Sequence, residues 1–290
     1  SNAMTSHKPY WPIGVFTSVD AGLGVHLEVA QDLKVPTVQV HAPHPHTRTR
    51  EHAQAFRAKC DAAGIQVTVI FGGFDGESYA DIPTTARTVG LVPLETRASR
   101  VAEMKEISDF ASWVGCPAIG LHIGFVPESS SPDYSELVRV TQDLLTHAAN
   151  HGQAVHLETG QESADHLLEF IEDVNRPNLG INFDPANMIL YGTGNPIEAL
   201  RKVARYVRSI HCKDALWAPV NERGKSWGQE VALGTGDVGM EAYLTTLWEI
   251  GYRGPLTIER EIPHDPVQQK KDLASALELL TGLRKKIANC

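Results

Sequence analysis

The chain has 290 residues, of which 42% are hydrophobic and 21% are charged, an ordinary composition for a soluble globular protein. Its formal net charge of −9 argues against duplex nucleic acid as the main partner, because phosphate binding favours a basic surface. No apolar run is long enough to cross a membrane, so we expect neither nucleic acid nor membrane among its partners.

The four cysteines show no CxxC motif or other short repeated spacing. We therefore expect reduced thiols in a cytoplasmic protein, and neither a disulfide framework nor a thiolate zinc site. Residues 1–3 stand before Met4 and resemble the remnant of an expression tag that carries no targeting information.

Predicted strands and helices alternate along the whole chain without a break in composition. In chain order, we expect strands at 13–19, 36–41, 65–71, 118–123, 154–158, 179–184, 207–214 and 255–261. Helical periodicity between them predicts helices at 24–34, 50–63, 94–115, 134–152, 163–174, 196–206, 240–251 and 272–287. This α/β pattern favours a single (β/α)₈ TIM barrel, one domain over residues 1–290, rather than an open doubly wound sheet.

Two loops and one missing fingerprint bear on function. The glycines at 20–24 have the wrong spacing for GxGxxG, and no P-loop occurs, which argues against dinucleotide binding. The loop at 72–93 is longer than most strand-to-helix connections, so it is either functional or disordered. A second long loop, at 215–239, is polar and rich in glycine.

The last four predicted strands each deliver a polar residue to the same end of the sheet. These residues are Glu158, Asp184, His211 and Glu259. Side chains alternate along a strand, so a polar group on the inner face of an apolar strand must meet something polar. In a parallel barrel the carboxyl ends of the strands form the mouth where active sites are built.

Three carboxylates and one imidazole predict a site for one divalent metal ion. Hard oxygen ligands suit Mn²⁺ or Mg²⁺, and Co²⁺ or Zn²⁺ are also compatible. The alternative is that each group caps a helix or pairs with a lysine or arginine. Burying four such groups at one end of a barrel is costly unless they are paired or bind a metal, which favours the metal site.

At this point the sequence resembles the xylose isomerase-like superfamily of sugar phosphate isomerases and epimerases, from about residue 13 to residue 283. The segments that carry the resemblance are HLETGQE (156–162), NFDPANMILYG (182–192), HCKDA (211–215), LGTGDV (233–238) and GYRGPLTIERE (251–261). In the ketose 3-epimerases of this superfamily the matching four residues bind one divalent metal. The resemblance therefore implies that Glu158 and Glu259 are also the acid/base pair, while Asp184 and His211 are ligands only.

The chemistry of a proton next to a carbonyl agrees with those roles. A metal that holds the carbonyl and adjacent hydroxyl oxygens stabilises the enediolate formed when the proton leaves. Epimerisation needs one base on each face of this intermediate, and isomerisation needs one base that returns the proton to the neighbouring carbon. A sugar or polyol isomerase or epimerase is our leading hypothesis. A metal-dependent lyase, dehydratase or hydrolase and a non-catalytic sugar-binding barrel are the alternatives.

Asn187 separates this chain from two related groups. Apurinic endonucleases of the superfamily use three zinc ions and a histidine at that position, and the loop at 215–239 also lacks their Asp-x-His motif. A three-zinc phosphodiesterase is therefore not expected. Epimerases of free ketoses tend to have a histidine there too, with an arginine after the histidine of strand seven. The substrate and its phosphorylation are left open.

Five further residues are candidates for contact with a small-molecule sugar substrate: His41, His122, Asn187, Lys213 and Trp217. The structural alternatives are a satisfied core histidine for His41 and His122, and a salt bridge to Asp214 or to a strand-end glutamate for Lys213. Trp217 and Trp227 could form an apolar wall over a sugar or fill a subunit interface. The exposed apolar loop residues also suggest a homodimer.

Four other residues have weaker claims on the site. Glu261 shares a face with Glu259 and is its rival for the ligand of the eighth strand. His156 faces inward one step deeper, as a supporting or core residue. His44 and His46 could line the mouth, although histidines in loops usually face solvent.

Overall fold

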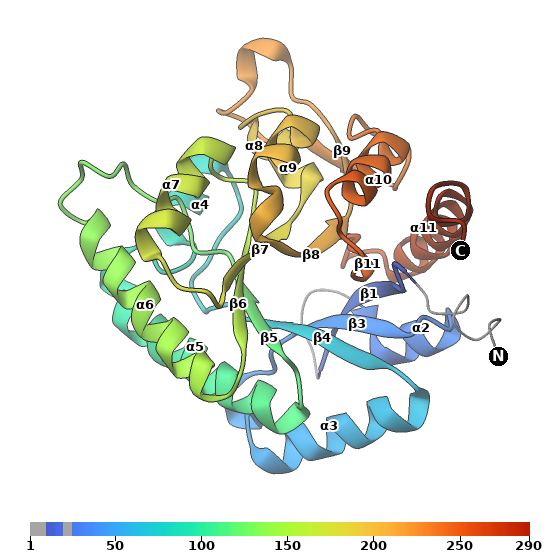
Figure 1. Cartoon of the computed structure of the whole chain (residues 1–290), viewed down its shortest axis with the longest axis horizontal. Coiled ribbons are helices and arrows are strands. Elements are labelled where there is room, and N and C mark those ends of the chain that lie inside the picture. Colours follow the sequence, from blue (N-terminus) through green and yellow to red (C-terminus); the bar gives the residue numbers. More distant parts are fainter. Residues whose placement is uncertain (1–9, 20–24) are drawn as a thin grey trace.

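A computed structural model describes residues 10–19 and 25–290, and its main sheet is a closed barrel of eight parallel strands. The strands are β1 (Ile13–Ser18), β3 (Thr37–His41), β4 (Gln66–Phe71), β5 (Ala118–Leu121), β6 (Ala154–Glu158), β7 (Leu179–Phe183), β8 (Val207–Cys212) and β11 (Leu256–Ile258). Strand β1 pairs with both β3 and β11, which closes the barrel (Figure 1). The predicted (β/α)₈ barrel is confirmed.

Helices surround this barrel in the expected order. They are α2 (Leu27–Asp32), α3 (Arg50–Ala63), α5 (Leu94–Val114), α6 (Tyr134–Asn150), α7 (Ala164–Val174), α9 (Pro196–Val203), α10 (Met240–Glu249) and α11 (Pro266–Ala288). Helix α11 begins before the predicted residue 272, because Asp265 caps it by accepting a hydrogen bond from the backbone N–H of Gln268. The predicted tag remnant, the glycines at 20–24 and the first residue of the predicted helix 24–34 lie outside the described residues.

Several short elements were not predicted from the sequence; two of them lie inside predicted helices and the others mostly in predicted loops. They are β2 (Val25–His26), α4 (Ile82–Thr88), α8 (Pro185–Tyr191), β9 (Asp214–Leu216), β10 (Gln229–Val231) and the 3₁₀ turns η1 (Pro45–Thr47), η2 (Ala204–Tyr206) and η3 (Val220–Glu222). Both α4 and α8 begin with an aspartate N-cap and a proline in the first turn, which start a helix without a long amphipathic pattern. Residues 185–191, which lie between the predicted strand 179–184 and the predicted helix 196–206, are therefore a helix and not a loop.

The two faces of each strand serve different environments. Side chains such as Val15, Ile119 and Leu157 point outward and join the large core between the barrel and its helices. The inward faces of the first strands form a separate small apolar cluster that includes Phe16 and Phe71. Strands β6 to β8 are polar on their inward face, so the interior is apolar on one side and polar on the other.

The segment around β9 and β10 forms an antiparallel ribbon that projects from the barrel (Figure 1, orange at the top). The buried residue Asp214 holds the segment that connects this ribbon to α10. The two carboxylate oxygens of Asp214 accept hydrogen bonds from the backbone N–H groups of Gly234, Gly236 and Val238 at 2.9–3.1 Å. A Cβ at Gly236 would lie 2.3 Å from an Asp214 oxygen, so the glycine in LGTGDV is required by this close approach.

Asp214 does not pair with Lys213, which was one of the alternatives for that lysine. Lys213 instead points to the barrel mouth, where its partners include Asn187 and Glu259. The two neighbours occupy opposite faces of one chain segment, as alternation predicts. Asp214 organises the loop, and Lys213 belongs to the candidate site.

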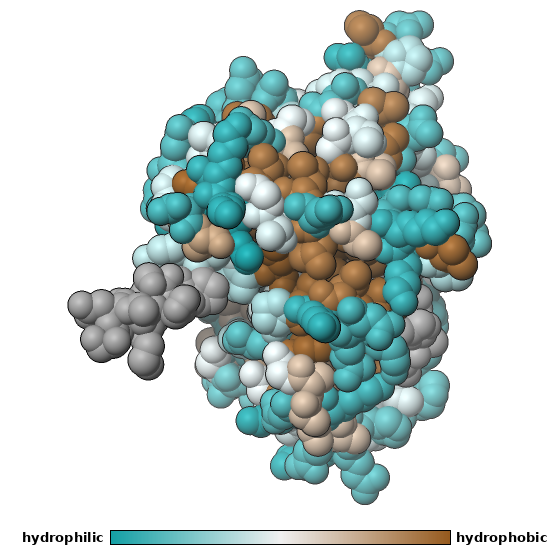
Figure 2. Space-filling view, turned by 90° about the vertical axis from the view of Figure 1, so that its right-hand side faces the viewer, coloured by the Kyte–Doolittle hydropathy of each residue, from teal (hydrophilic) through white to brown (hydrophobic). Residues whose placement is uncertain are grey.

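In the described part of the chain, no helix is both long enough and apolar enough to cross a bilayer. On the face seen in Figure 2, apolar residues gather in the middle and hydrophilic residues surround them. The four cysteines are free thiols, as expected. The cytoplasmic location, the single-domain organisation and the homodimer stay predictions.

Replacing Asp214 by asparagine tests the loop anchor. The amide group would present a donor to backbone N–H groups that now share the carboxylate, so at least one buried N–H would lose its acceptor. We expect the free energy of unfolding to fall by roughly 2 kcal/mol in urea titrations. Asp61→Asn, at an exposed position of α3, is the matched control and should leave the unfolding midpoint unchanged. Equal midpoints for all three proteins would contradict the anchoring role.

Candidate metal centre

The four predicted ligands meet at the carboxyl ends of β6, β7, β8 and β11. One ligand atom from each of Glu158, Asp184, His211 and Glu259 lies within 4.8 Å of the other three, and all four side chains are buried. Glu158 is the last residue of β6, and Asp184 and Glu259 directly follow β7 and β11. The parallel strands therefore bring together residues that are far apart in the sequence.

The Nδ1 atom of His211 lies at the centre of this cluster. It lies 3.2 Å from Asp184 Oδ2, 3.5 Å from Glu259 Oε1 and 4.0 Å from Glu158 Oε1. Three acidic oxygens thus surround a single ring nitrogen. Such a group of atoms could hold one divalent cation, with the nitrogen lone pair as its fourth protein ligand.

Gln39 of β3 sets the orientation and tautomer of the His211 ring. The Nε2 atom of His211 lies 2.6 Å from Gln39 Oε1, which can only accept a hydrogen bond. Nε2 therefore carries a proton, and Nδ1 is the ring nitrogen that faces the carboxylates and could act as a metal ligand. The sequence analysis missed Gln39, although its place two residues before His41 on an apolar strand already put it on the inward face.

A layer of hydrogen bonds below the cluster holds Gln39 in turn. Gln39 Nε2 donates to Asn182 Oδ1 at 3.0 Å, and Ser209 Oγ donates to the same oxygen at 2.7 Å. The Ser209 hydroxyl then accepts from Nδ1 of His156 at 2.8 Å. Burial lowers the pKa of His156 to about 4, so this histidine is neutral and supports the layer. It contacts none of the four candidate ligands directly.

Glu158 is held by two neighbours on the far side from His211. Its Oε2 atom lies 2.7 Å from Nε2 of His122 and accepts a hydrogen bond from Nδ2 of Asn187 at 2.9 Å. Burial by itself raises the pKa of Glu158, but the charge and hydrogen bond of His122 outweigh burial and lower it. Conversely, Glu158 outweighs the burial of His122 and raises the pKa of that imidazole to about 9.

The surroundings of Glu259 stabilise its ionised form less than those of Glu158 do. Its Oε1 atom accepts a hydrogen bond from Lys213 Nζ at 3.2 Å. Burial and the nearby charge of Glu261 nevertheless raise its pKa. A divalent cation bound beside Glu259 would stabilise the ionised form of this carboxylate, which burial and Glu261 disfavour.

Glu261 lies outside the cluster of four. Its side chain is 45% exposed and its Oε2 atom is 3.4 Å from Lys213 Nζ. This position favours Glu259 as the ligand of the eighth strand. Arg260, between them, faces the other way and pairs with Glu230 and Asp272 at 3.0 and 2.8 Å.

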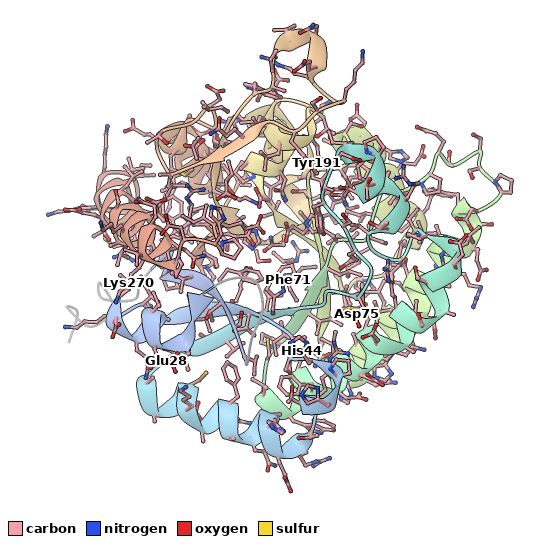
Figure 3. All side chains as sticks on the ribbon, turned by 180° about the vertical axis from the view of Figure 1, so that it is seen from behind. Glu28, His44, Phe71, Asp75, Tyr191 and Lys270 are labelled. Carbon is pink, nitrogen blue, oxygen red and sulfur yellow. The ribbon has the colours of Figure 1, made fainter. Side chains whose placement is uncertain are left out.

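A pocket of about 380 Å³ opens above the cluster. Its lining includes the predicted residues His41, His122, Asn187 and Lys213 together with Glu158 and Glu259. Aromatic side chains of Phe71 and Tyr191 form part of its wall. Figure 3 shows Phe71 in the middle of the molecule and Tyr191 above it, with Glu28 and Lys270 at the edge of the molecule.

Not every predicted residue reaches this pocket. Trp217 is absent from the lining, and its ring packs against the guanidinium of Arg223 at 4.6 Å. Trp227 lines the pocket instead, with its ring 4.7 Å from that of Tyr191. His44 and His46 are exposed and stack on each other 6.0 Å apart, away from the site.

The long loop at 72–93 supplies residues that the sequence analysis did not single out. Glu77 and Tyr79 line the pocket, and Glu77 accepts hydrogen bonds from the backbone N–H groups of Phe74 and Gly90. Of the two predictions for this loop, a functional one fits its position better than disorder. Glu230, on β10, also lines the pocket. No motif marks these residues, because loop folding alone brings them to the mouth.

Comparison with solved structures places this barrel among known proteins. The chain is 97% identical to a xylose isomerase domain protein from Planctomyces limnophilus, with a TM-score of 0.94; the match covers 98% of this chain and 100% of that one. That likeness extends over the barrel and its surrounding helices.

Two curated proteins are more distant relatives. The uncharacterized protein MJ1311 of Methanocaldococcus jannaschii is 26% identical over 55% of this chain and 56% of its own length. A ketose 3-epimerase of Arthrobacter globiformis is 30% identical over 36% of this chain and 29% of its own length. The matched region thus spans about half of the first relative and less than a third of the second.

The family comparison covers most of the chain. Residues 27–283 match the xylose isomerase-like TIM barrel family, a range that runs from α2 to the last turns of α11 and includes all four residues of the cluster. With that coverage, the chain belongs to the xylose isomerase-like TIM barrel family.

Proposed function

We propose that the protein is a divalent-metal-dependent isomerase or epimerase of a sugar or related polyol. The observation that carries the proposal is the convergence of three buried carboxylates on the Nδ1 atom of His211 at the floor of a pocket. The name of the relative from Arthrobacter globiformis, a ketose 3-epimerase, points to the same class of reaction.

A bound divalent cation would polarise the substrate carbonyl and stabilise the negative charge that develops when a neighbouring C–H bond breaks. Within this scheme Glu158 and Glu259 move the proton, because their carboxylates extend from β6 and β11 on two sides of His211. One glutamate removes the proton from the substrate carbon. In epimerisation the other glutamate then delivers a proton to the opposite face of that carbon, whereas in isomerisation the first glutamate returns the proton to the adjacent carbon.

The neighbours of the two glutamates would keep them in position for proton transfer. His122 and Asn187 fix the carboxylate of Glu158, and Lys213 fixes that of Glu259. Each of these contacts limits rotation of a carboxylate that must stay close to a substrate carbon. His122 and Lys213 also bring positive charge close to the region where an enediolate would form.

The charge of the pocket favours a substrate without a phosphate group. Its described lining contains five glutamates and no arginine. Lys213 is the one lysine in that lining, and its ammonium group already donates to Asn187, Glu259 and Glu261 at 3.1–3.4 Å. A phosphate would meet repulsion here without a free cationic partner. An uncharged polyhydroxy ketone can use the carboxylates as acceptors and the rings of Tyr191 and Trp227 as an apolar wall.

Elimination is the main chemical alternative on the same site. Removing the same proton can be followed by loss of a hydroxyl group on the next carbon, which would make the protein a dehydratase. Product analysis separates the two reactions: a changed stereocentre or a moved carbonyl supports the proposal, and a dehydrated keto product supports elimination. Sugar binding without turnover is the third outcome.

The acid/base assignment is tested by Glu158→Gln and Glu259→Gln. Each variant retains the size of the side chain but removes its ability to accept a proton, so we expect turnover to fall at least ~10²-fold. Incorporation of solvent deuterium into the substrate should fall in parallel. Glu261→Gln is the matched control on the same strand end and should lose much less. Near wild-type turnover in both of the first two variants would refute their role.

Metal dependence is tested with protein that has been stripped by a chelator. Elemental analysis after dialysis should find about one equivalent of Mn²⁺ per chain, and saturating Mn²⁺ should raise the unfolding temperature. At a concentration 100 times the dissociation constant the added stability would be about 2.7 kcal/mol. His211→Gln should lose both effects, whereas His44→Gln, at the exposed loop, should retain them. Absence of binding by Mn²⁺, Mg²⁺, Co²⁺ and Zn²⁺ at the barrel would contradict the proposal.

The substrate class is tested by comparing free ketoses with their phosphate esters. We expect kcat/KM for the free sugar to exceed that for the ester at least ~10-fold, because the ester brings like charges together in the pocket. Glu261→Gln removes one of those charges and should narrow the difference. A preference for the ester in the wild-type protein would show that the acidic lining does not select the substrate.

A further inference from the structure

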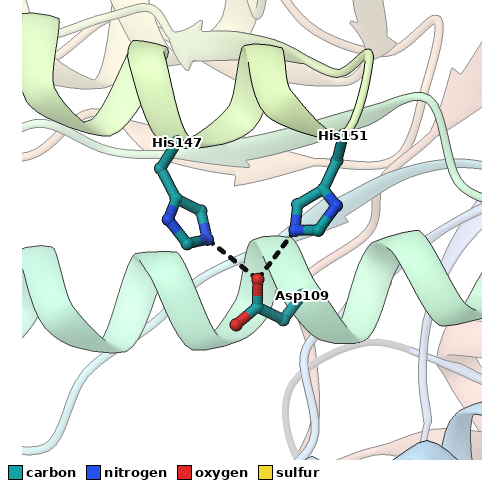
Figure 4. Close-up of side chains that lie close together, drawn as sticks. All are labelled: Asp109, His147 and His151. Carbon is teal, nitrogen blue, oxygen red and sulfur yellow. Dashed lines mark hydrogen bonds and ion pairs between the residues drawn. The ribbon is translucent and has the colours of Figure 1, made fainter.

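A second cluster of potential metal ligands lies between two helices on the outside of the barrel. It consists of Asp109 on α5 and of His147 and His151 at the end of α6 (Figure 4). The Nε2 atoms of both histidines lie 2.8 Å from the same oxygen of Asp109, Oδ1. In the described part of the chain, this is the one cluster of three or more such ligands besides the barrel centre.

We propose that these three residues bind a single divalent transition-metal ion of the Zn²⁺ class that links α5 to α6. Two histidines four residues apart lie on the same face of a helix, a spacing that allows both imidazoles to bind one ion. The third ligand comes from the neighbouring helix. Ligand atoms of the three residues already lie within 4.8 Å of one another, so small side-chain rotations would bring each to about 2.0–2.2 Å from a shared ion.

The contacts of the three side chains show what the ion would replace. Both rings now share one carboxylate oxygen, and the second oxygen of Asp109 takes no part in these two contacts. An ion between the rings and the carboxylate would exchange two hydrogen bonds for three coordinate bonds. The side chains of His147, His151 and Asp109 are 29%, 32% and 39% exposed, so the ion can enter from solvent and complete its coordination with water.

Contacts on either side fix α6, and the segment that directly follows it, against α5. One turn earlier on each helix, Lys105 pairs with Asp143 at 2.7 Å. On the buried side, Ser108 Oγ donates to Gln153 Oε1 at 2.6 Å. The ligands are therefore presented by packed elements whose separation is already fixed, which reduces the entropy lost when the ion binds.

The place of this cluster in the barrel makes it a structural link. Asp109 and His151 lie toward the ends of helices that lead into β5 and β6, at the edge of the barrel opposite to the mouth. The donor sets also differ. Two imidazoles and one carboxylate favour Zn²⁺, Ni²⁺ or Cu²⁺, whereas three carboxylates and one imidazole favour Mn²⁺ or Mg²⁺.

The test compares chelator-stripped wild-type protein with His151→Gln and Asp109→Asn. Zn²⁺ bound after equilibrium dialysis is counted by elemental analysis, and the secondary structure of each variant is checked by circular dichroism. His52→Gln is the control, because it replaces an exposed helical histidine outside both clusters. We expect the wild type and the control to bind one more equivalent of Zn²⁺ than either cluster variant.

Electron paramagnetic resonance with Cu²⁺ identifies the ligands directly. The helix cluster offers two imidazole nitrogens and the barrel centre offers one, so a two-nitrogen coupling pattern reports the helix cluster. It should be present in the wild type and His52→Gln and lost in His151→Gln. Equal Zn²⁺ stoichiometry in all four proteins, or a two-nitrogen pattern that persists in His151→Gln, would overturn the proposal.

Discussion

The buried carboxylates of Glu158, Asp184 and Glu259 lie close together around the Nδ1 atom of His211. Most of the other contacts at the barrel mouth depend on this arrangement. Like charges at such distances in a buried site repel strongly unless cations stand between them. Lys213 contacts Glu259, and His122 contacts Glu158, so each glutamate has a positively polarised neighbour. These two partners lie at the edge of the cluster, and its centre, next to His211 Nδ1, is where a divalent ion would balance the charge.

The barrel supplies the rigidity that this arrangement requires. Each strand buries one face against the helices and turns the other inward, so a change in side-chain chemistry along the inward face does not weaken the outer core. Below the cluster, the hydrogen bonds from His211 through Gln39 to Asn182 fix the ring that carries the central nitrogen. Asp184 has two roles: one carboxylate oxygen faces His211, and the other accepts a hydrogen bond from the backbone N–H of Asn187 and so caps α8.

The two clusters of potential metal ligands in the described chain differ in ways that follow from their positions. At the mouth the ligands come from four strands, are buried, and are mainly carboxylates. On the outside they come from two helices, are partly exposed, and are mainly imidazoles. The first arrangement forms a polar floor for the pocket. The second joins two elements that already pack together, so its effect is on the link between α5 and α6.

The order of strands and helices, the closed barrel and the four residues of the cluster could be predicted from the sequence. Periodicity identifies elements, and alternation identifies which residues of each strand face inward, so Glu158, Asp184 and His211 follow from local patterns. Glu259 and Glu261 share a face, and only the structure separates them. Short helices such as α4 and α8 were missed because their start depends on one capping aspartate and a proline rather than on a long amphipathic repeat.

Only the tertiary structure decided which loop residues reach the pocket and which partners hold the ligands. Glu77 and Glu230 reach it through loop paths with no sequence period, and Trp227 rather than Trp217 faces it. Gln39 and His211 meet across the barrel, although 172 positions separate them. Such contacts depend on barrel closure, a property of the whole sheet. Local sequence determines which face a side chain occupies, whereas packing across the barrel determines what it meets there.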